Sequence, residues 1–228
     1  MTLCRVYGGE GEMMISPEAY YEIALRGKSQ SEILEEINEL QEEISRLKQV
    51  IEKYGKKAEA GIFPDPLTRL KCNREYLERA KRALEEAGGH YEPTEEERRD
   101  QSFNKALVSM HRFILKISGF FSGWTKYTYT INEESVAVDA EHGFDYELSE
   151  PSVYDVYKPF TREEFVRGIA NLHIGEWEQS YDDPGVLDGT QWGIRIEYED
   201  GREPVEIDGS NAYPYNYREL LKFLEIDN

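Results

Sequence analysis

Apolar residues recur every three or four positions along the first half of the chain, which is the spacing of one face of an α-helix. Between residues 33 and 54 the steps alternate between four and three, and this heptad pattern predicts one long helix with a continuous apolar stripe. The stripe consists of Ile33, Ile37, Leu40, Ile44, Leu47, Ile51 and Tyr54.

A second helix is predicted from about Leu67 to Ala87, because Asp65 suits the N-cap and Pro66 suits the first helical position. Its stripe has the same spacing but is interrupted by Asn73. We expect this helix to fold back on the first as an antiparallel hairpin. The same stripes would also permit a homodimer in which the helical arms of two chains pair as a coiled coil.

A third helix is predicted to begin after Thr94, which forms a capping box with Glu97. The spacing from Phe103 onward extends this helix to Ile117. Three amphipathic helices can bury one another, so residues 1–117 are expected to form a helical hairpin or a three-helix, coiled-coil-like bundle.

Alternating apolar and polar residues replace this pattern in the second half and predict strands at residues 124–131 and 135–140. The dipeptide at 200–201, Asp-Gly, predicts a hairpin turn, and turning there places Ile194 opposite Ile207. Two helices are also expected, one after a capping box near residue 161 and one at the C-terminal end. The predicted fold class is therefore α+β, with residues 118–228 forming a small antiparallel-sheet domain with two helices.

The charge is distributed unequally between these two regions. The 228 residues include 46 Asp and Glu against 27 Lys and Arg, a net charge of −19, of which −3 lies up to residue 117 and −16 after it. A negative field repels nucleic acid and anionic membranes and attracts basic protein surfaces. Direct binding to nucleic acid or to a membrane is therefore disfavoured, and a basic protein surface is the expected partner.

Other features indicate a cytoplasmic protein. Only two cysteines are present, too few for a disulfide framework. The N-terminal residues lack the apolar segment of a secretory signal, and no stretch approaches the roughly 18–20 apolar residues of a membrane span.

The sequence contains residue types that can act in catalysis or bind metal ions, but it contains no recognised catalytic motif. Asp182, Asp183 and Asp188 cluster in one loop without the spacing of an EF-hand, and the four histidines share no ligand spacing. His173 is expected to cap the carbonyls at a helix end. We therefore expect no metal centre and no cofactor.

One segment, from residue 177 to residue 224, resembles a known group of sequences. It reads W-x3-Y-D-D-P…D-G-T-Q-W-x-I-x-I-x-Y-x-D-G…G-S-N-A-Y-P-x-N-Y-x-E-L-L, and it resembles the C-terminal segment of uncharacterised proteins from Firmicutes and their phages. The resemblance covers about a fifth of the chain. It implies a bacterial or phage origin and assigns no activity.

These observations favour a non-catalytic interaction protein whose acidic domain binds a basic partner. If the origin is a phage, the expected form is an inhibitor that occupies the nucleic-acid channel of a host defence protein, with carboxylates in place of phosphates. The residues expected to contact the partner are Glu133, Glu134, Asp182, Asp183, Tyr215 and Tyr217.

Two alternatives stay open. One is a metal-dependent hydrolase that uses the loop from Asp182 to Asp188, together with Glu176 or Glu178. The other is a protein that binds a small nucleotide or sugar in an aromatic pocket.

Overall fold

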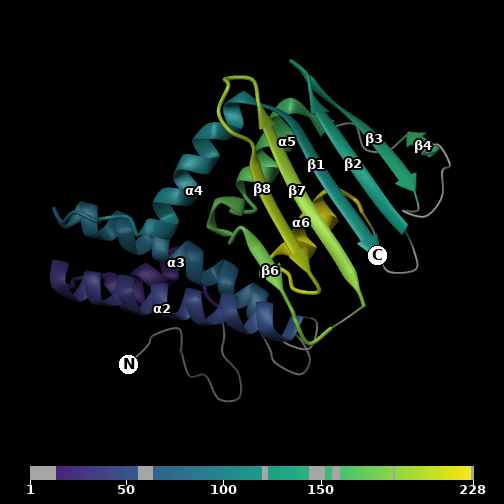
Figure 1. Cartoon of the computed structure of the whole chain (residues 1–228). Helices are drawn as coiled ribbons and strands as arrows, with labels where there is room; N and C mark the ends of the chain where they lie inside the picture. Colours follow the sequence, from purple (N-terminus) through teal and green to yellow (C-terminus); the bar gives the residue numbers. More distant parts are fainter. Residues whose placement is uncertain are drawn as a thin grey trace. The chain divides into compact units, whose positions relative to one another are not determined.

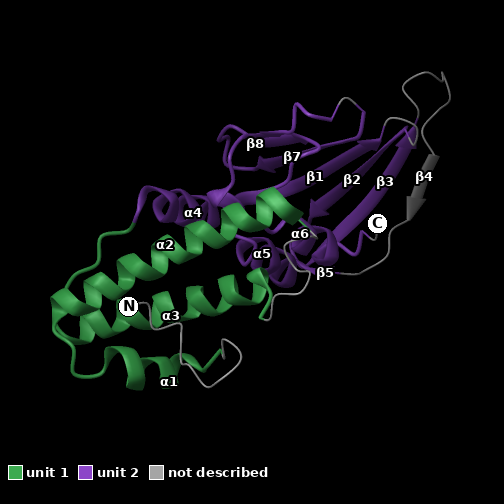
Figure 2. Ribbon diagram, turned by 90° about the horizontal axis from the view of Figure 1, so that it is seen from below, with its two compact units in different colours: residues 1–93 green, residues 94–228 purple. Residues whose placement is uncertain are grey.

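The computed structural model describes residues 14–55, 64–119, 123–143, 152–155, 160–186 and 188–226, with residues 152–155 described by their backbone only. The predicted mixed α+β class is confirmed, since the chain contains both long helices and one large sheet (Figure 1). The chain forms two compact units, residues 1–93 and residues 94–228, which Figure 2 colours separately.

The first unit is helical. Its elements are α1 (Pro17–Tyr20), the π-helical turn η1 (Tyr21–Leu25), α2 (Gln30–Tyr54) and α3 (Pro66–Glu86). Local side-chain hydrogen bonds set the helix starts: Ser29 and Glu32 form a capping box before α2, and Asp65 Oδ1 accepts from the backbone N–H groups of Leu67 and Thr68 before α3. The predicted Asp-Pro start of the second helix is therefore confirmed.

Helices α2 and α3 pack against each other through their predicted stripes. Ile37 and Leu40 of α2 and Leu84 of α3 are almost completely buried. Gln30 Nε2, at the start of α2, donates a hydrogen bond to the Ala87 carbonyl oxygen just beyond α3, at 2.6 Å. The start of one helix thus lies beside the end of the other, and the two form an antiparallel hairpin within one chain.

Tyr20 of α1 closes one side of this hairpin. Its ring stacks on Tyr76 of α3, with 4.4 Å between the ring centroids. The buried Glu36 of α2 accepts hydrogen bonds from the Tyr20 hydroxyl at 2.8 Å and from Lys28 Nζ at 2.9 Å. This buried carboxylate is therefore both hydrogen-bonded and charge-paired, as burial requires.

The second unit contains a sheet and several short helices. In chain order its elements are α4 (Glu95–Ala106), η3 (Leu107–Ser109), β1 (Met110–Gly119), β2 (Gly123–Ile131), β3 (Ser135–Gly143), β4 (Ser152–Asp155), β5 (Phe160–Thr161), α5 (Arg162–Ala170), η4 (Ile174–Glu176), β6 (Ser180–Asp182), β7 (Thr190–Tyr198), β8 (Val205–Ser210) and α6 (Tyr217–Phe223).

The strands pair in the order β4-β3-β2-β1-β7-β8-β6, and β5 pairs with β3. Each of these pairs is antiparallel except the last, β8 with β6, which is parallel. The sheet is therefore mixed, and the prediction of a purely antiparallel sheet is wrong at this edge. The short edge strand β6 had no recognisable alternation, because it is only three residues long.

The predicted β7–β8 hairpin is confirmed in its register. Ile194 lies opposite Ile207, and Arg195 lies opposite Glu206. Strand β8 begins at Val205, directly after Pro204, so the residue without an N–H donor stays outside the ladder.

One face of the sheet carries the core of this unit. Phe113, Leu115 and Tyr129 of the central strands are buried there beneath helix α5, whose Phe165 ring lies 5.2 Å from the Tyr129 ring. Gly168 of α5 allows Phe223 of α6 to pack closely, since a Cβ at this position would stand 2.2 Å from the Phe223 ring.

The third predicted helix is correct in its start and wrong in its length. Thr94 and Glu97 do form the capping box, but α4 ends at Ala106, and the residues from Met110 onward form β1, a central strand of the sheet. Phe113, Leu115 and Ile117 alternate along β1, and its two neighbours β2 and β7 satisfy its backbone hydrogen-bonding groups on both sides.

The compact units consequently divide between residues 93 and 94, whereas the sequence placed the domain boundary at residue 117. Helix α4 and strand β1 belong to the unit that contains the sheet, and α4 packs on η4 within it. The described part of the first unit is therefore a hairpin of two long helices with a short third segment, and α4 is not one of its helices.

Candidate functional site

Two of the predicted partner-binding residues lie at one end of the sheet. Glu133 and Glu134 occupy the turn between β2 and β3, and both are exposed. The β7–β8 turn lies at the same end, because β7 runs parallel to β2. Glu199, Asp200 and Glu203 of this turn are exposed.

Val108, in the η3 turn that precedes β1, lies between these two acidic turns and is 74% exposed. Its carbonyl oxygen accepts a hydrogen bond from Arg162 Nη2 at 2.7 Å, while Arg162 Nη1 donates to the carbonyl of Asn132 in the β2–β3 turn at 3.3 Å. On the other side, Ser109 Oγ donates to Asp200 Oδ2 at 2.8 Å. We call Val108 and the two turns, residues 132–134 and 199–203, the acidic end.

The charge of the acidic end is only partly neutralised. Arg202 binds Asp200 at 2.6 Å, and its hydrogen bonds lower the pKa of the Asp200 carboxyl well below its ordinary value. Within the described part of the chain, no basic side chain forms an ion pair with Glu133, Glu134 or Glu199. The acidic end therefore presents unneutralised carboxylates around one exposed aliphatic side chain.

Asp182 and Asp183, also predicted to bind the partner, lie at the opposite end of the sheet. Strand β6 runs parallel to β8 and β1, and so opposite to β2. Both residues are exposed, and Asp183 Oδ1 accepts a hydrogen bond from the Gly185 N–H at 3.0 Å. The four predicted carboxylates thus do not form one patch, and the described residues of the 182–188 loop form no metal-ligand cluster.

The sheet face opposite the core is also not continuously anionic. Arg195 forms ion pairs with Glu206 and, at 2.8 Å, with Glu197. On the neighbouring strands Lys126 binds Glu141 at 2.8 Å. These carboxylates are locally neutralised, so the concentration of negative charge in the sequence corresponds to separate patches rather than to one surface.

The predicted aromatic contacts are wrong, because both tyrosines are buried. Tyr215 is 7% exposed and Tyr217 is 5% exposed. The Tyr217 ring packs 4.7 Å from the Trp192 ring, and burial raises the pKa of its hydroxyl. Tyr217 and Trp192 belong to an aromatic cluster that also includes Trp177, Tyr181 and Tyr213.

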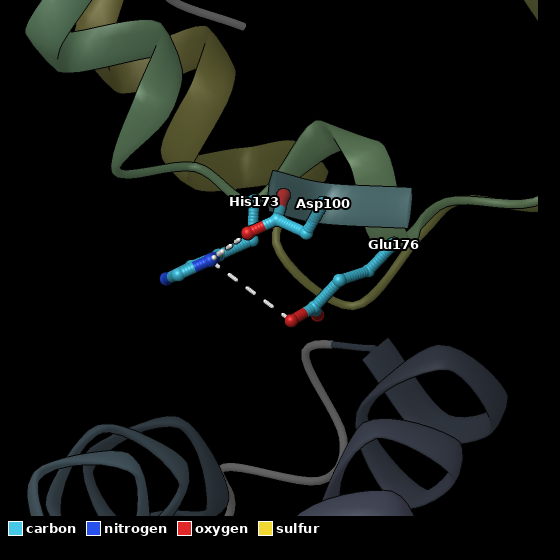
Figure 3. A group of neighbouring side chains, drawn as sticks. All are labelled: Asp100, His173 and Glu176. Atoms are coloured by element: carbon cyan, nitrogen blue, oxygen red, sulfur yellow. Dashed lines mark hydrogen bonds and ion pairs between the residues drawn. The ribbon is translucent and has the colours of Figure 1, made fainter. Parts of the chain in front are cut away.

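A second cluster lies where α4 meets η4. His173 Nδ1 donates a hydrogen bond to Asp100 Oδ2 at 2.8 Å and lies 3.9 Å from Glu176 Oε1 (Figure 3). Each of the three residues offers one nitrogen or oxygen atom that could bind a metal ion, and these three atoms all lie within 4.8 Å of one another. The prediction that His173 caps helix carbonyls is wrong, because its ring faces two carboxylates.

The backbone holds this cluster tightly. His173 has φ of 50°, in the left-handed region, which a non-glycine residue adopts at a cost. Gly175 lies two residues later, and a Cβ there would stand 2.6 Å from the Asp100 Cα atom. The hydroxyl of the buried Tyr215 donates a hydrogen bond to Glu176 Oε2 at 2.8 Å and so helps to hold the Glu176 carboxylate in position.

The sequence indicates only parts of this cluster. It suggests Glu176 as a hydrolase residue, but it predicts a helix-capping role for His173. The three-residue spacing of His173 and Glu176 is the one local indication that they lie together. Asp100 lies 73 residues before His173, and nothing in the spacing of the sequence connects them.

Comparison with known proteins assigns neither region a role: no protein-family model matches this chain, and no curated protein or solved structure matches it. Within the described residues, no helix has the length and apolar character needed to cross a membrane.

Proposed function

We propose that this protein is a non-catalytic interaction protein whose acidic end binds a basic surface of a partner protein. The observation that carries the proposal is the exposed Val108 between two turns that present Glu133, Glu134 and Glu199. Carboxylates that form no ion pair attract cationic side chains, and the central Val108 side chain loses its contact with water once the partner covers it.

Electrostatics alone would give a weak and poorly oriented complex. The Val108 side chain adds an apolar contact at the centre of a polar rim, which is the usual arrangement of protein interfaces. The hydrogen bonds of Arg162 and Ser109 fix the positions of the two turns relative to Val108. This order reduces the entropy lost on binding.

A more specific form of the proposal is an inhibitor of phage origin that occupies the nucleic-acid channel of a host defence protein. The acidic end supports it, since carboxylates spaced across two turns can replace phosphates at a basic surface. In this form the α2–α3 hairpin is an arm that spaces the acidic unit from other partners. The binding of such a partner would compete with nucleic acid.

The test is a fluorescence-anisotropy titration of the full chain with a labelled basic peptide in which arginines flank one central leucine. We expect binding to weaken steeply as the salt concentration rises from about 50 to about 200 mM, because salt screens the attraction between the peptide and the carboxylates. A probe with glutamine in place of each arginine should not bind.

Two charge-matched variants locate the binding surface. The first replaces Glu133, Glu134 and Glu199 by Gln and should weaken binding of the peptide about tenfold or more. The second replaces three carboxylates at the opposite end of the sheet, namely Asp182→Asn, Asp183→Asn and Asp188→Asn, and should change binding little. Equal weakening by both variants, or by neither, would overturn the assignment to the acidic end.

A further inference from the structure

The cluster of Asp100, His173 and Glu176 brings together three side chains of the types that bind metal ions. They come from α4 and from the segment around η4, which pack against each other in the second unit. The distances from His173 Nδ1 are 2.8 Å to Asp100 Oδ2 and 3.9 Å to Glu176 Oε1. Ligand atoms bound to one ion at about 2.0–2.2 Å lie at comparable distances from one another.

Charge gives a second argument. The side chains of Asp100 and Glu176 are 10% and 6% exposed, and the His173 ring is the basic group between them. Two buried carboxylates on either side of one imidazole ring favour a nearby cation.

A hydrogen-bond count gives a third, independent argument. Asp100 is 7% exposed, and its Oδ1 atom is buried with no hydrogen-bond partner. Its Oδ2 atom accepts from His173 and from Asn104 Nδ2 at 3.2 Å. Buried carboxylate oxygens are normally satisfied, so this orphaned oxygen indicates an interaction that the protein alone does not provide.

The neighbouring residues hold the candidate ligands in place. The Tyr215 hydroxyl bonds Glu176 Oε2 and leaves Oε1 directed toward the His173 ring, as Figure 3 shows for the three cluster residues. Asn104 bonds the Asp100 carboxylate from the same helix. Such outer hydrogen bonds orient ligands at metal sites. The His173 side chain is 36% exposed, which leaves the cluster open to solvent on one side.

We propose that Asp100, His173 and Glu176 bind one divalent first-row transition-metal ion, with the ion taking the place of the proton between His173 Nδ1 and Asp100. One imidazole nitrogen favours such an ion over Mg²⁺ and Ca²⁺, which prefer oxygen ligands alone. Water would complete the coordination from the exposed side.

The test is calorimetric titration of the full chain with Zn²⁺, after treatment with a chelator and its removal. We expect one tight site per chain for Zn²⁺ and no comparable site for Mg²⁺ or Ca²⁺. Three variants remove one ligand each: Asp100→Asn, Glu176→Gln and His173→Asn. Asparagine is chosen at position 173 because it tolerates a positive φ.

Each of these variants should weaken Zn²⁺ binding by about tenfold or more, since even outer-shell changes at metal sites cost about 10–100-fold. The matched control is His90→Asn, which removes an exposed histidine that lies 3.3 Å from Glu92 in the first unit. It should leave the tight site unchanged. Loss of tight binding in the control but not in the ligand variants would overturn the proposal.

A measurement on the unaltered chain keeps the proposal testable if a variant fails to fold. Histidine side-chain ¹⁵N resonances report which ring nitrogen binds a metal, and Zn²⁺ should shift Nδ1 of a single histidine. A shift that involves several histidines, or none at one equivalent of Zn²⁺, would contradict the site.

Discussion

A methyl group on Gly175 would stand 2.6 Å from the Asp100 Cα atom and 2.7 Å from the Phe103 Cβ atom. The α4 backbone and the η4 turn are therefore in contact at a position where only glycine fits. This contact sets the distance between the two segments that carry Asp100, His173 and Glu176.

Replacing Gly175 by Ala should lower the free energy of unfolding by about 1–3 kcal/mol, because the first clash is with backbone that cannot rotate away. The control is Gly193→Ala, where the nearest atom to the new Cβ is the Ile207 carbonyl oxygen at 3.8 Å. Its stability should stay close to that of the unaltered chain. Urea unfolding of both variants measures the difference, and equal stabilities would contradict the tight contact.

The buried tyrosines Tyr215 and Tyr217 should respond differently to loss of their hydroxyls. The Tyr217 hydroxyl is buried without a hydrogen-bond partner, so Tyr217→Phe removes an unsatisfied polar group and should leave the melting temperature unchanged or raise it. Tyr215→Phe removes the hydrogen bond to Glu176 and should cost about 1–3 kcal/mol.

Thermal unfolding of both variants in the presence of a chelator makes this comparison independent of any metal. A lower melting temperature for Tyr217→Phe than for Tyr215→Phe would show that the hydrogen-bond assignment is wrong.

Local features of the sequence predicted local structure well. The capping boxes at Thr94 and Thr161 involve residues three positions apart, and both form. The heptad stripe of α2 is buried from Ile33 to Leu47, although Tyr54 at its end is 51% exposed. The Asp-Gly turn predicted the β7–β8 register correctly. In each case the interacting residues are close in sequence or repeat with a period that only one type of element satisfies.

The failures come from long-range pairing. The segment 110–117 fits both periods, since Met110, Ile114 and Ile117 have helical spacing while Phe113, Leu115 and Ile117 alternate. Pairing of β1 with β2 and with β7 decides in favour of a strand, and β7 lies about 80 residues further along. The burial of Tyr215 and the approach of Asp100 to His173 depend on the same tertiary packing.

The α2–α3 hairpin leads to a prediction about association. Ile37, Leu40 and Leu47 are at most 1% exposed within one chain, so the stripe that would pair two chains is already occupied. The melting temperature should therefore not change when the protein concentration is raised from about 1 to about 100 μM, as expected for a fold that needs no second chain. A melting temperature that rises with concentration would indicate that the helices pair between chains.

Glu197 leads to a prediction about pH. Its hydrogen bond with Arg195 is the main cause of a pKa below the ordinary value for a glutamate, and Arg112 and His111 also face it. A carboxyl whose pKa is lowered by folding stabilises the folded state above its unfolded pKa, about 4.3, and loses this contribution as the pH falls through the lower folded value.

The variant Glu197→Gln should therefore be less stable than the unaltered chain at pH 7, by up to about 1 kcal/mol, the usual size of a partly exposed ion pair. The difference should shrink as the pH falls below about 4.3, because the unaltered carboxyl then becomes protonated as well. The melting temperatures of the two proteins, measured at several values between about pH 7 and about pH 3, show whether the difference in stability shrinks. Glu133→Gln is the control, since Glu133 is exposed and forms no ion pair within the described residues, and it should show no such pH-dependent gap. A gap for Glu197→Gln that is constant or widens toward low pH would mean that Arg195 does not stabilise the ionised carboxylate in the folded protein.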